Sequence, residues 1–410
     1  MPWKVSGVVE KRKQFVSEYE SGDWTMTDLC RAYGVSRVTG YEVLQRWRQL
    51  GVQGLEEQSR AAQRHPNQMA EEIEGEVLRM RAAHPTWGPR KLKKVLEGGG
   101  QRYPAASTIG ELLQREGLAQ SRRKRRRAEP YQRPFESADR PNLVWCADFK
   151  GWFRSRDGER IDPFTMTDAC SRYLLRCQAV DKADTQRVRA VIEAAFREYG
   201  LPGAMRTDNG APFASQAIAG LSLLSVWLMK LGVTPERIKP GHPEQNGRHE
   251  RMHRTLKQET ACPPAANRRA QQRAFDRFRR EFNEVRPHEA LGQETPSSVY
   301  EPSLRQYPAR IPEPEYDSTM LVRRVGLRGQ ISWKHEHVFL TETLRGERVG
   351  LEPIDDQWWI VHFASFPIAL FDSEKRRIQR LPKQKGGGND GNPKTGDSHI
   401  PTASATAAGH

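Results

Sequence analysis

The stretch LVWCADFKGWF, residues 143–153, is a run of apolar residues with one carboxylate, Asp148, in its middle. Such a run predicts a strand that is buried in a sheet. An ionised carboxylate costs on the order of several kcal/mol to desolvate there. Asp148 therefore needs a cation beside it, which is either an Arg or Lys side chain or a metal ion.

The residues that follow predict strands alternating with helices, and a second acid, Asp208, stands at the end of one strand. Asp-Asn-Gly is an ordinary turn sequence, but a strand end is where sites of α/β domains usually lie. The order of elements predicts a mixed α/β domain with a central sheet over residues 139–302. The expected elements after the first strand are two strands in 162–180, a helix at 185–200, a strand at 204–210, a helix through Leu231, a strand at 234–240 and a helix from about Glu244.

A third acid comes from GHPEQNGRHERMHRTLK, residues 241–257, where Glu244 and Glu250 compete. On a helix Glu250 shares one face with Asn246 and Gly247, and glycine lets a DNA backbone approach closely. Glu244 lies six residues earlier, about 240° around the helix, so both glutamates cannot face one site. The cations Arg251, His253, Arg254 and Lys257 follow, and the last three are expected on the Glu250 face, which suits a metal ligand that works against phosphate.

The overall charge favours a polyanionic partner, because 66 Lys and Arg residues oppose 51 Asp and Glu residues and leave a net charge of +15. A membrane partner is not expected, since the most apolar stretch, 218–233, is too short to span a bilayer and contains Lys230. No secretory signal is visible at the N-terminus. The five scattered cysteines predict reduced thiols in a cytosolic protein, without a disulfide framework or a zinc site.

Two helix-turn-helix units are expected before the α/β domain, at residues 1–60 and 65–120. In the first, a short helix through Ala32 is followed by a turn at Gly34 and a second helix from the cap Ser36 to about Leu50. If the unit binds DNA, Arg37, Thr39 and Tyr41 should enter the major groove; otherwise it is a small helical packing module. The core residues expected here are Leu29, Val35, Val43, Leu44 and Trp47.

A basic linker is expected at residues 121–138, because SRRKRRR holds six consecutive cations that repel one another. It is either a solvated tether or a segment that neutralises phosphates with Arg122, Arg123, Lys124 and Arg125. Beyond Pro314, five short strands predict a small barrel at 315–375. Residues 382–410 contain few large apolar residues and predict a disordered tail.

Three motifs together, WCAD at 145–148, TDNG at 207–210 and HPEQNGRHER at 242–251, resemble the D,D,E catalytic core of retroviral integrases and bacterial insertion-sequence transposases. The resemblance covers most of the chain. It implies a multidomain α+β protein with helix-turn-helix units, an RNase H-like core and a small SH3-like barrel. It also implies two Mg²⁺ ions, or Mn²⁺, held by Asp148, Asp208 and Glu250, with Asp148 bridging both.

The family resemblance leaves one discrepancy between the two glutamates. The usual family spacing, counted on from Asp208, ends on Glu244, whereas the family's NG-x-x pattern ends on Glu250. We assign the third acid to Glu250 and attribute the difference to extra residues near the helix that ends at Leu231. Asp168, on a neighbouring strand, is expected to pair with Arg172 or Arg176 rather than to serve the site.

The function implied is that of a cytoplasmic, nucleoid-associated bacterial transposase, which cleaves the 3′ ends of its element and joins them to target DNA. Double-stranded DNA is the expected partner, contacted also by Asn246, Arg251, Arg254 and Lys257, and two DNA ends imply a homo-oligomer. Two alternatives remain. One is a non-catalytic DNA-binding regulator with the same fold, and the other is a nuclease acting on RNA–DNA hybrids, which the helix-turn-helix units disfavour.

Overall fold

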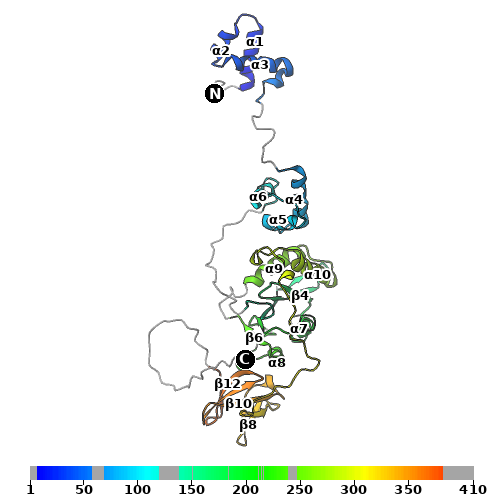
Figure 1. Ribbon diagram of the computed structural model, residues 1–410, viewed down its shortest axis with the longest axis vertical. Coiled ribbons are helices and arrows are strands. Elements are labelled where there is room, and N and C mark those ends of the chain that lie inside the picture. The colour runs from blue at the N-terminus through cyan, green and yellow to red at the C-terminus, as the bar shows by residue number, and fades with distance from the viewer. Residues whose placement is uncertain are drawn as a thin grey trace, which may run out of the picture. The chain divides into compact units, whose positions relative to one another are not determined.

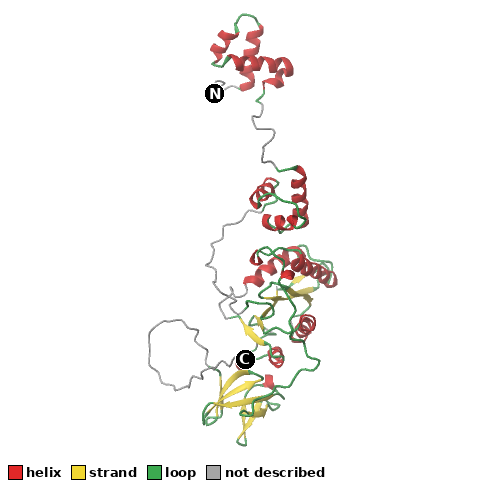
Figure 2. Ribbon diagram, viewed as in Figure 1, coloured by secondary structure: helices red, strands yellow, loops and turns green. Residues whose placement is uncertain are grey.

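The computed structural model describes residues 7–57, 69–119 and 138–381, apart from residues 150, 183, 211, 214, 216 and 239–246. The chain divides into two compact units, residues 1–70 and 71–410. Figures 1 and 2 show helices alone before residue 120 and a mixture of strands and helices after residue 138. The expected basic linker at 121–138 and the expected tail at 382–410 lie, but for residue 138, outside the described residues.

The first unit is a three-helix bundle closed by a short 3-10 helix. Thr25 and Ser36 cap α2 and α3 by accepting hydrogen bonds from the backbone N–H of Asp28 and Thr39, which satisfies donors that the first helical turn leaves unpaired. Gly34 ends α2 in the left-handed conformation, as the sequence predicts. The helices are α1 (Val8–Glu20), α2 (Met26–Tyr33), α3 (Arg37–Leu50) and η1 (Gly51–Leu55).

The core of this unit contains the five apolar residues predicted from helical spacing: Leu29, Val43 and Leu44 are buried, and Val35 and Trp47 pack against them. The helix that the sequence analysis did not assign, α1, adds Phe15 and Val16 to that core.

Three further helices open the second unit, within the stretch expected to form the second helix-turn-helix unit. Pro89 occupies the first turn of α5, where its missing N–H costs nothing. Hydrogen bonds link this helical segment to the α/β core: His84 Nδ1 lies 2.9 Å from Glu281 Oε1, and Lys94 Nζ donates to Glu294 Oε1 over 2.8 Å. The helices are α4 (Glu71–Ala83), α5 (Pro89–Glu97) and α6 (Ala106–Arg115).

The α/β core is built on a mixed sheet, as expected. Strand β3 pairs with β1, β4 and the short β2, and β5 and β6 follow beyond β1 in this order. The first strands are antiparallel, whereas β1, β5 and β6 are parallel. The strands are β1 (Val144–Phe149), β2 (Phe153–Arg154), β3 (Arg160–Asp168), β4 (Leu174–Val180), β5 (Ala204–Thr207) and β6 (Thr234–Arg237).

Helices cover both faces of this sheet. Alternating residues of β4 show this plainly: Leu175 joins the apolar cluster that holds α7 and α8, while Leu174 and Cys177 join the cluster that holds α9 and α10. The helices of the core are α7 (Thr185–Tyr199), η2 (Ile218–Gly220), α8 (Leu223–Lys230), α9 (Gly247–Thr260), α10 (Arg268–Glu284), η4 (Glu289–Leu291) and η5 (Pro296–Ser298).

Helix α10 is not among the elements predicted above, although the spacing of its apolar residues indicates a helix. Phe275, Phe278 and Phe282 recur at helical spacing and are all buried, and Asn267 caps the helix through the backbone N–H of Ala270. The omission matters because α10 supports the face of the sheet on which α9 lies.

The C-terminal strands form an antiparallel sheet in the order β13-β12-β11-β10-β7 and a separate hairpin, β8-β9. Their apolar cluster also takes in Val226 and Met229 of α8. The elements are β7 (Leu321–Arg324), β8 (Gln330–Trp333), β9 (Glu336–Phe339), η6 (Glu342–Leu344), β10 (Arg348–Pro353), β11 (Trp358–Phe363), β12 (Phe366–Asp372) and β13 (Arg377–Gln379).

Two details of this sheet correct the sequence-based expectation of five strands. The segment QISWKHEHVFLT is a hairpin rather than one strand, because Lys334 and His335 both adopt positive φ angles, 46° and 68°. Two successive residues with positive φ make the tight turn that matches the twist of paired strands. A further strand, β13, pairs with β12.

Two expectations from composition agree with the structure. All five cysteines are free thiols. Among the described residues no helix has the length and apolar character needed to cross a membrane.

We predict that Phe275→Ala lowers the free energy of unfolding by about 3–5 kcal/mol, because it removes a fully buried ring and leaves a cavity between α10 and the sheet. Urea unfolding followed by tryptophan fluorescence measures the change. The control is Phe339→Ala, whose ring is 62% exposed and whose loss should change stability little. Equal effects of the two substitutions would contradict the assigned packing.

Candidate functional site

Asp148 lies near the end of the central strand β1, opposite Thr165 of β3. Its side chain is half-buried, and its Oδ1 accepts a hydrogen bond of 2.7 Å from the backbone N–H of Phe149. The apolar strand therefore carries a carboxylate to the edge of the buried sheet, as the sequence predicts.

Asp208 follows directly after β5, which runs parallel to β1. The register pairs Ala147 with Thr207, so Asp148 and Asp208 are the next residues on two adjacent strands. Residues that pair across parallel strands lie side by side, about 4.8 Å apart between strand axes. The two acids therefore stand next to each other at the carboxyl ends of their strands.

Hydrogen bonds hold the strand ends around Asp208. Its Oδ1 accepts from the backbone N–H of Gly210 over 3.1 Å, and Asn209 Nδ2 donates to the carbonyl oxygen of Ile238 over 2.8 Å. Between β5 and β6, Arg206 pairs with Glu236 at 2.7 Å. The turn after β5 is therefore held in place at the end of the sheet where the two acids lie.

Helix α9 presents two different faces. His249, Met252, His253 and Leu256 are buried, whereas Glu250 is exposed. The expectation that His253 shares the face of Glu250 is therefore wrong. The apolar residues Met252 and Leu256 decide which side is buried, and His249 and His253 fall on that side. The cations that remain exposed with Glu250 are Arg251, Arg254 and Lys257.

Two threonine hydroxyl groups of β3 join this buried face to the sheet. Thr165 Oγ1 lies 2.6 Å from His249 Nε2, 2.7 Å from His253 Nε2 and 3.2 Å from the carbonyl oxygen of Asp148. Thr167 Oγ1 lies 3.2 Å from His249 Nδ1. Since a hydroxyl group has one proton, at least one imidazole must donate its N–H to Thr165.

Burial lowers the pKa of His249 to about 3. The imidazole is therefore neutral at physiological pH, and its nitrogens are available for hydrogen bonds or for a metal ion.

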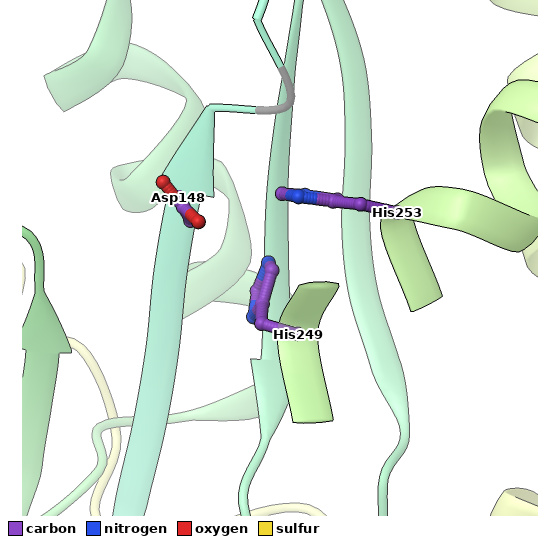
Figure 3. A group of neighbouring side chains, drawn as sticks. All are labelled: Asp148, His249 and His253. Carbon is purple, nitrogen blue, oxygen red and sulfur yellow. The ribbon is translucent and has the colours of Figure 1, made fainter. Parts of the chain in front are cut away.

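The structure brings the side chain of Asp148 together with two histidines that the sequence-based expectation did not include. Among the described residues, Asp148, His249 and His253 form a group whose potential metal-ligating atoms all lie within 4.8 Å of one another. Figure 3 shows His253 pointing from α9 toward Asp148, with His249 beside them. Asp208 and Glu250 are not members of this group.

Asp168 does not pair with Arg176 as expected, because Arg176 pairs with Glu198. Its buried carboxylate instead accepts from the backbone N–H of Asn142 and from the N–H and hydroxyl of Ser171, over 2.7–2.8 Å. Burial raises the pKa of Asp168. These contacts give Asp168 a structural role at the turn after β3.

The residues expected to contact DNA fall in three groups. In the first unit, Arg37 and Tyr41 are exposed on the N-terminal part of α3, and Thr39 is half-buried beside the cap Ser36. On α9, Arg251, Arg254 and Lys257 are exposed. The remaining five, together with Glu244, lie outside the described residues: Arg122, Arg123, Lys124, Arg125 and Asn246.

Sequence reasoning missed His249 and Thr165. The signal for His249 was present, since His249-Glu250-Arg251-Met252-His253 places two histidines four residues apart, on one side of a helix. Thr165 carried no such signal, because its role depends on the pairing of β3 with β1.

The mixed sheet with acids at adjacent strand ends defines an integrase-type domain. Residues 138–243 and 231–296 both match the family described as Integrase core domain. Residues 11–62 match a Helix-turn-helix domain, and residues 39–113 match a Homeodomain-like domain.

The chain is similar to proteins of bacterial insertion elements. The chain is 30% identical over 231 residues to an uncharacterized 31.7 kDa protein of insertion element IS407 from Burkholderia multivorans, covering 55% of this chain and 80% of that protein. It is 28% identical over 249 residues to a 39.2 kDa protein of insertion element IS476 from Xanthomonas euvesicatoria, covering 58% and 68%. The chain belongs to the family of insertion-element proteins that carry an integrase core domain, here together with helix-turn-helix domains.

Two solved structures similar to this chain are retroviral. The HTLV-2 integrase catalytic core domain in complex with magnesium is 16% identical, with a TM-score of 0.31 and coverage of 39% of this chain and 97% of that one. A chain of the simian T-cell lymphotropic virus intasome is 14% identical, with a TM-score of 0.35 and coverage of 75% and 100%.

We predict that Thr165→Val lowers the free energy of unfolding by about 1–3 kcal/mol, because it leaves buried imidazole nitrogens without a partner. Thr165→Ser keeps the hydroxyl group and should retain most of the stability. Urea denaturation of the three proteins measures the effect. A serine variant as unstable as the valine variant would show that the methyl group, not the hydroxyl, is what matters.

Proposed function

We propose that this protein is a DNA transposase, which cleaves the 3′ ends of its insertion element and transfers them to target DNA with Mg²⁺. The observation that carries the proposal is the pair of acids, Asp148 and Asp208, at the ends of adjacent parallel strands in an integrase core domain. Two like charges side by side are unfavourable unless a cation binds between them.

The donor chemistry supports magnesium as the cofactor. Asp148, Asp208 and Glu250 offer carboxylate oxygens, which are the ligands that Mg²⁺ and Mn²⁺ prefer. We assign all three to metal binding, with Asp148 bridging two ions. Bound in such a pair, divalent ions activate an attacking oxygen and stabilise the leaving oxygen of a phosphodiester.

The reaction takes two steps at one site. In the first, water attacks the phosphorus at the element end, the P–O3′ bond breaks, and a free 3′-OH remains. In the second, this 3′-OH attacks a phosphorus of the target and displaces a target 3′ oxygen. No side chain forms a covalent bond to DNA, so the protein only has to hold the two substrates in line.

Exposed cations of the described residues would hold the DNA near the acids. Arg251, Arg254 and Lys257 are exposed on α9, where they would neutralise backbone phosphates, and helical spacing places Arg254 and Lys257 on the face of Glu250. Asn246 and the linker cations Arg122, Arg123, Lys124 and Arg125 are proposed as further contacts. Because two element ends react together, we propose that the protein acts as a homo-oligomer on DNA.

We assign the remaining parts of the chain by the same proposal. Domains at 1–60 and 65–120 bind element ends, 139–302 is catalytic, and 315–375 forms a small barrel. The hairpin β8-β9 contacts both edge strands, β7 and β13, which supports closure of that sheet. The proposed setting is the bacterial nucleoid.

The test of catalysis is strand transfer in Mg²⁺ with DNA carrying the element ends. Asp148→Asn, Asp208→Asn and Glu250→Gln should each reduce the rate by at least about 10²-fold, since they remove charge that acts on the transition state. Glu284→Gln is the matched control, because this exposed glutamate lies on α10. Intact cleavage by the Asp148 or Glu250 variant would refute the assignment.

The same assay separates the alternative of a non-catalytic regulator. A wild-type protein that binds element ends but never cleaves them, in either Mg²⁺ or Mn²⁺, would support the regulator. Binding alone does not decide, because both functions require it.

The recognition helix α3 provides a separate prediction. Arg37→Ala should weaken binding to element ends and reduce the slope of log affinity against log salt by about one phosphate contact, if Arg37 meets the backbone. Arg48→Ala, at the other end of α3, is the matched control and should change neither. Filter binding over a range of salt concentrations measures both, and equal effects of the two variants would exclude the assigned DNA-facing end.

A further inference from the structure

The histidine pair on α9 differs in chemistry from the carboxylates assigned to magnesium. His249 and His253 are 97% buried, and their nitrogens, with a carboxylate oxygen of Asp148, lie within 4.8 Å of one another. Figure 3 shows the three side chains facing the same space, Asp148 from β1 and the histidines from α9. The proposed transposase reaction makes no use of either imidazole.

This donor set selects a transition metal. Imidazole nitrogens suit Zn²⁺ and its neighbours, whereas Mg²⁺ takes oxygen ligands. Two histidines and one carboxylate are a common set of protein ligands for zinc, and they leave one position for water. Two histidines four residues apart on one helix, in the order His-Glu-x-x-His, are a recurrent way to supply two of these ligands.

The surroundings of the histidines match those of zinc-binding imidazoles. Such an imidazole usually has its second ring nitrogen hydrogen-bonded to a neighbour. Thr167 Oγ1 supplies this contact to His249 Nδ1 at 3.2 Å, which leaves His249 Nε2 on the side of Thr165. Thr165 Oγ1 meets Nε2 of both histidines, so the two nitrogens already converge on one point.

We propose that Asp148, His249 and His253 form a binding site for Zn²⁺, and that Zn²⁺ bound there inhibits the protein by taking Asp148 from Mg²⁺. On binding, coordination to zinc replaces hydrogen bonds of the imidazoles to Thr165. The inhibitory part rests on the proposed function, whereas zinc binding itself does not.

The competition follows from the shared carboxylate. A carboxylate oxygen of Asp148 that coordinates Zn²⁺ beside the histidines would no longer be available to hold Mg²⁺ beside Asp208. Imidazole nitrogens suit Zn²⁺, whereas Mg²⁺ prefers oxygen ligands, so the two histidines favour Zn²⁺ over Mg²⁺. A small concentration of Zn²⁺ is therefore expected to counteract a large excess of Mg²⁺.

Direct binding tests the site without any assay of activity. Zn²⁺ is titrated calorimetrically into the full-length protein after removal of metals with a chelator, and Co²⁺ is titrated while visible absorption is recorded. His253→Gln, His249→Asn and Asp148→Asn should each weaken Zn²⁺ binding by more than about 10-fold, since even the loss of a residue that only supports a ligand costs that much. His337→Gln, an exposed histidine on β9, is the matched control.

Three results would overturn the site. The first is a zinc affinity that is equal in the wild type and in all three variants, and the second is a loss of zinc affinity in His337→Gln as large as in those variants. The third is a cobalt spectrum dominated by sulfur ligation, which would place the metal on cysteine. Folding of each variant is checked by its urea transition. If a histidine variant does not fold, Asp148→Asn, whose side chain is only half-buried, decides alone.

Strand transfer tests the inhibition. With Mg²⁺ fixed, Zn²⁺ should inhibit the wild type, and the midpoint should rise by more than about 10-fold in His253→Gln, measured against the residual activity of that variant. An unchanged midpoint refutes inhibition through this site. Zinc binding that depends on the histidines, in a protein without any strand transfer, would retain the site and refute the transposase proposal instead.

Discussion

The hydroxyl group of Thr165 joins three elements of the core at one point. It lies on β3, contacts the carbonyl oxygen of Asp148 on β1, and meets both buried imidazoles of α9. Because α9 carries Glu250 between its two histidines, the position of that acid depends on how the imidazoles are held. A helix held by apolar contacts alone, through Met252 and Leu256, would keep more freedom to rotate and slide.

The parallel pairing of β1 and β5 is the second constraint on the site. It sets Asp148 and Asp208 side by side without any contact between their side chains having to form. The ion pair of Arg206 with Glu236 and the hydrogen bond from Asn209 to Ile238 fix the neighbouring strand ends. The backbone thus brings two like charges together, and this arrangement is stable only because a half-buried edge leaves room for counterions or metal ions.

The sequence predicted most elements of the fold because their signals are local. Thr25, Ser36 and Gly34 mark helix ends by their own chemistry, and alternating or helical apolar patterns mark the rest. Prediction from the sequence failed where the structure depends on contacts between residues that are far apart in the chain. The hairpin turn at Lys334 and His335 contains no glycine or asparagine, and the buried side of α9 is set by a sheet that a local pattern does not contain.

The same distinction applies to the site. Asp148 and Asp208 were predictable because an acid in or directly after an apolar strand is conspicuous in the sequence. His253 was placed on the wrong face because helical spacing gives only relative angles, and His253 lies close enough to Glu250 around the helix to be counted on either side. Only the burial of Met252 and Leu256 against β3 and β4 resolves the choice.

The two faces of α9 divide the chemistry of the core between oxygen and nitrogen ligands. The exposed face offers a carboxylate and cations, which suit phosphate and Mg²⁺, while the buried face offers two imidazoles. Asp148 lies within reach of the buried face and beside Asp208 as well. On the two proposals made above, this carboxylate belongs to two sets of ligands with different preferences, and the metal ions present would determine which set it joins.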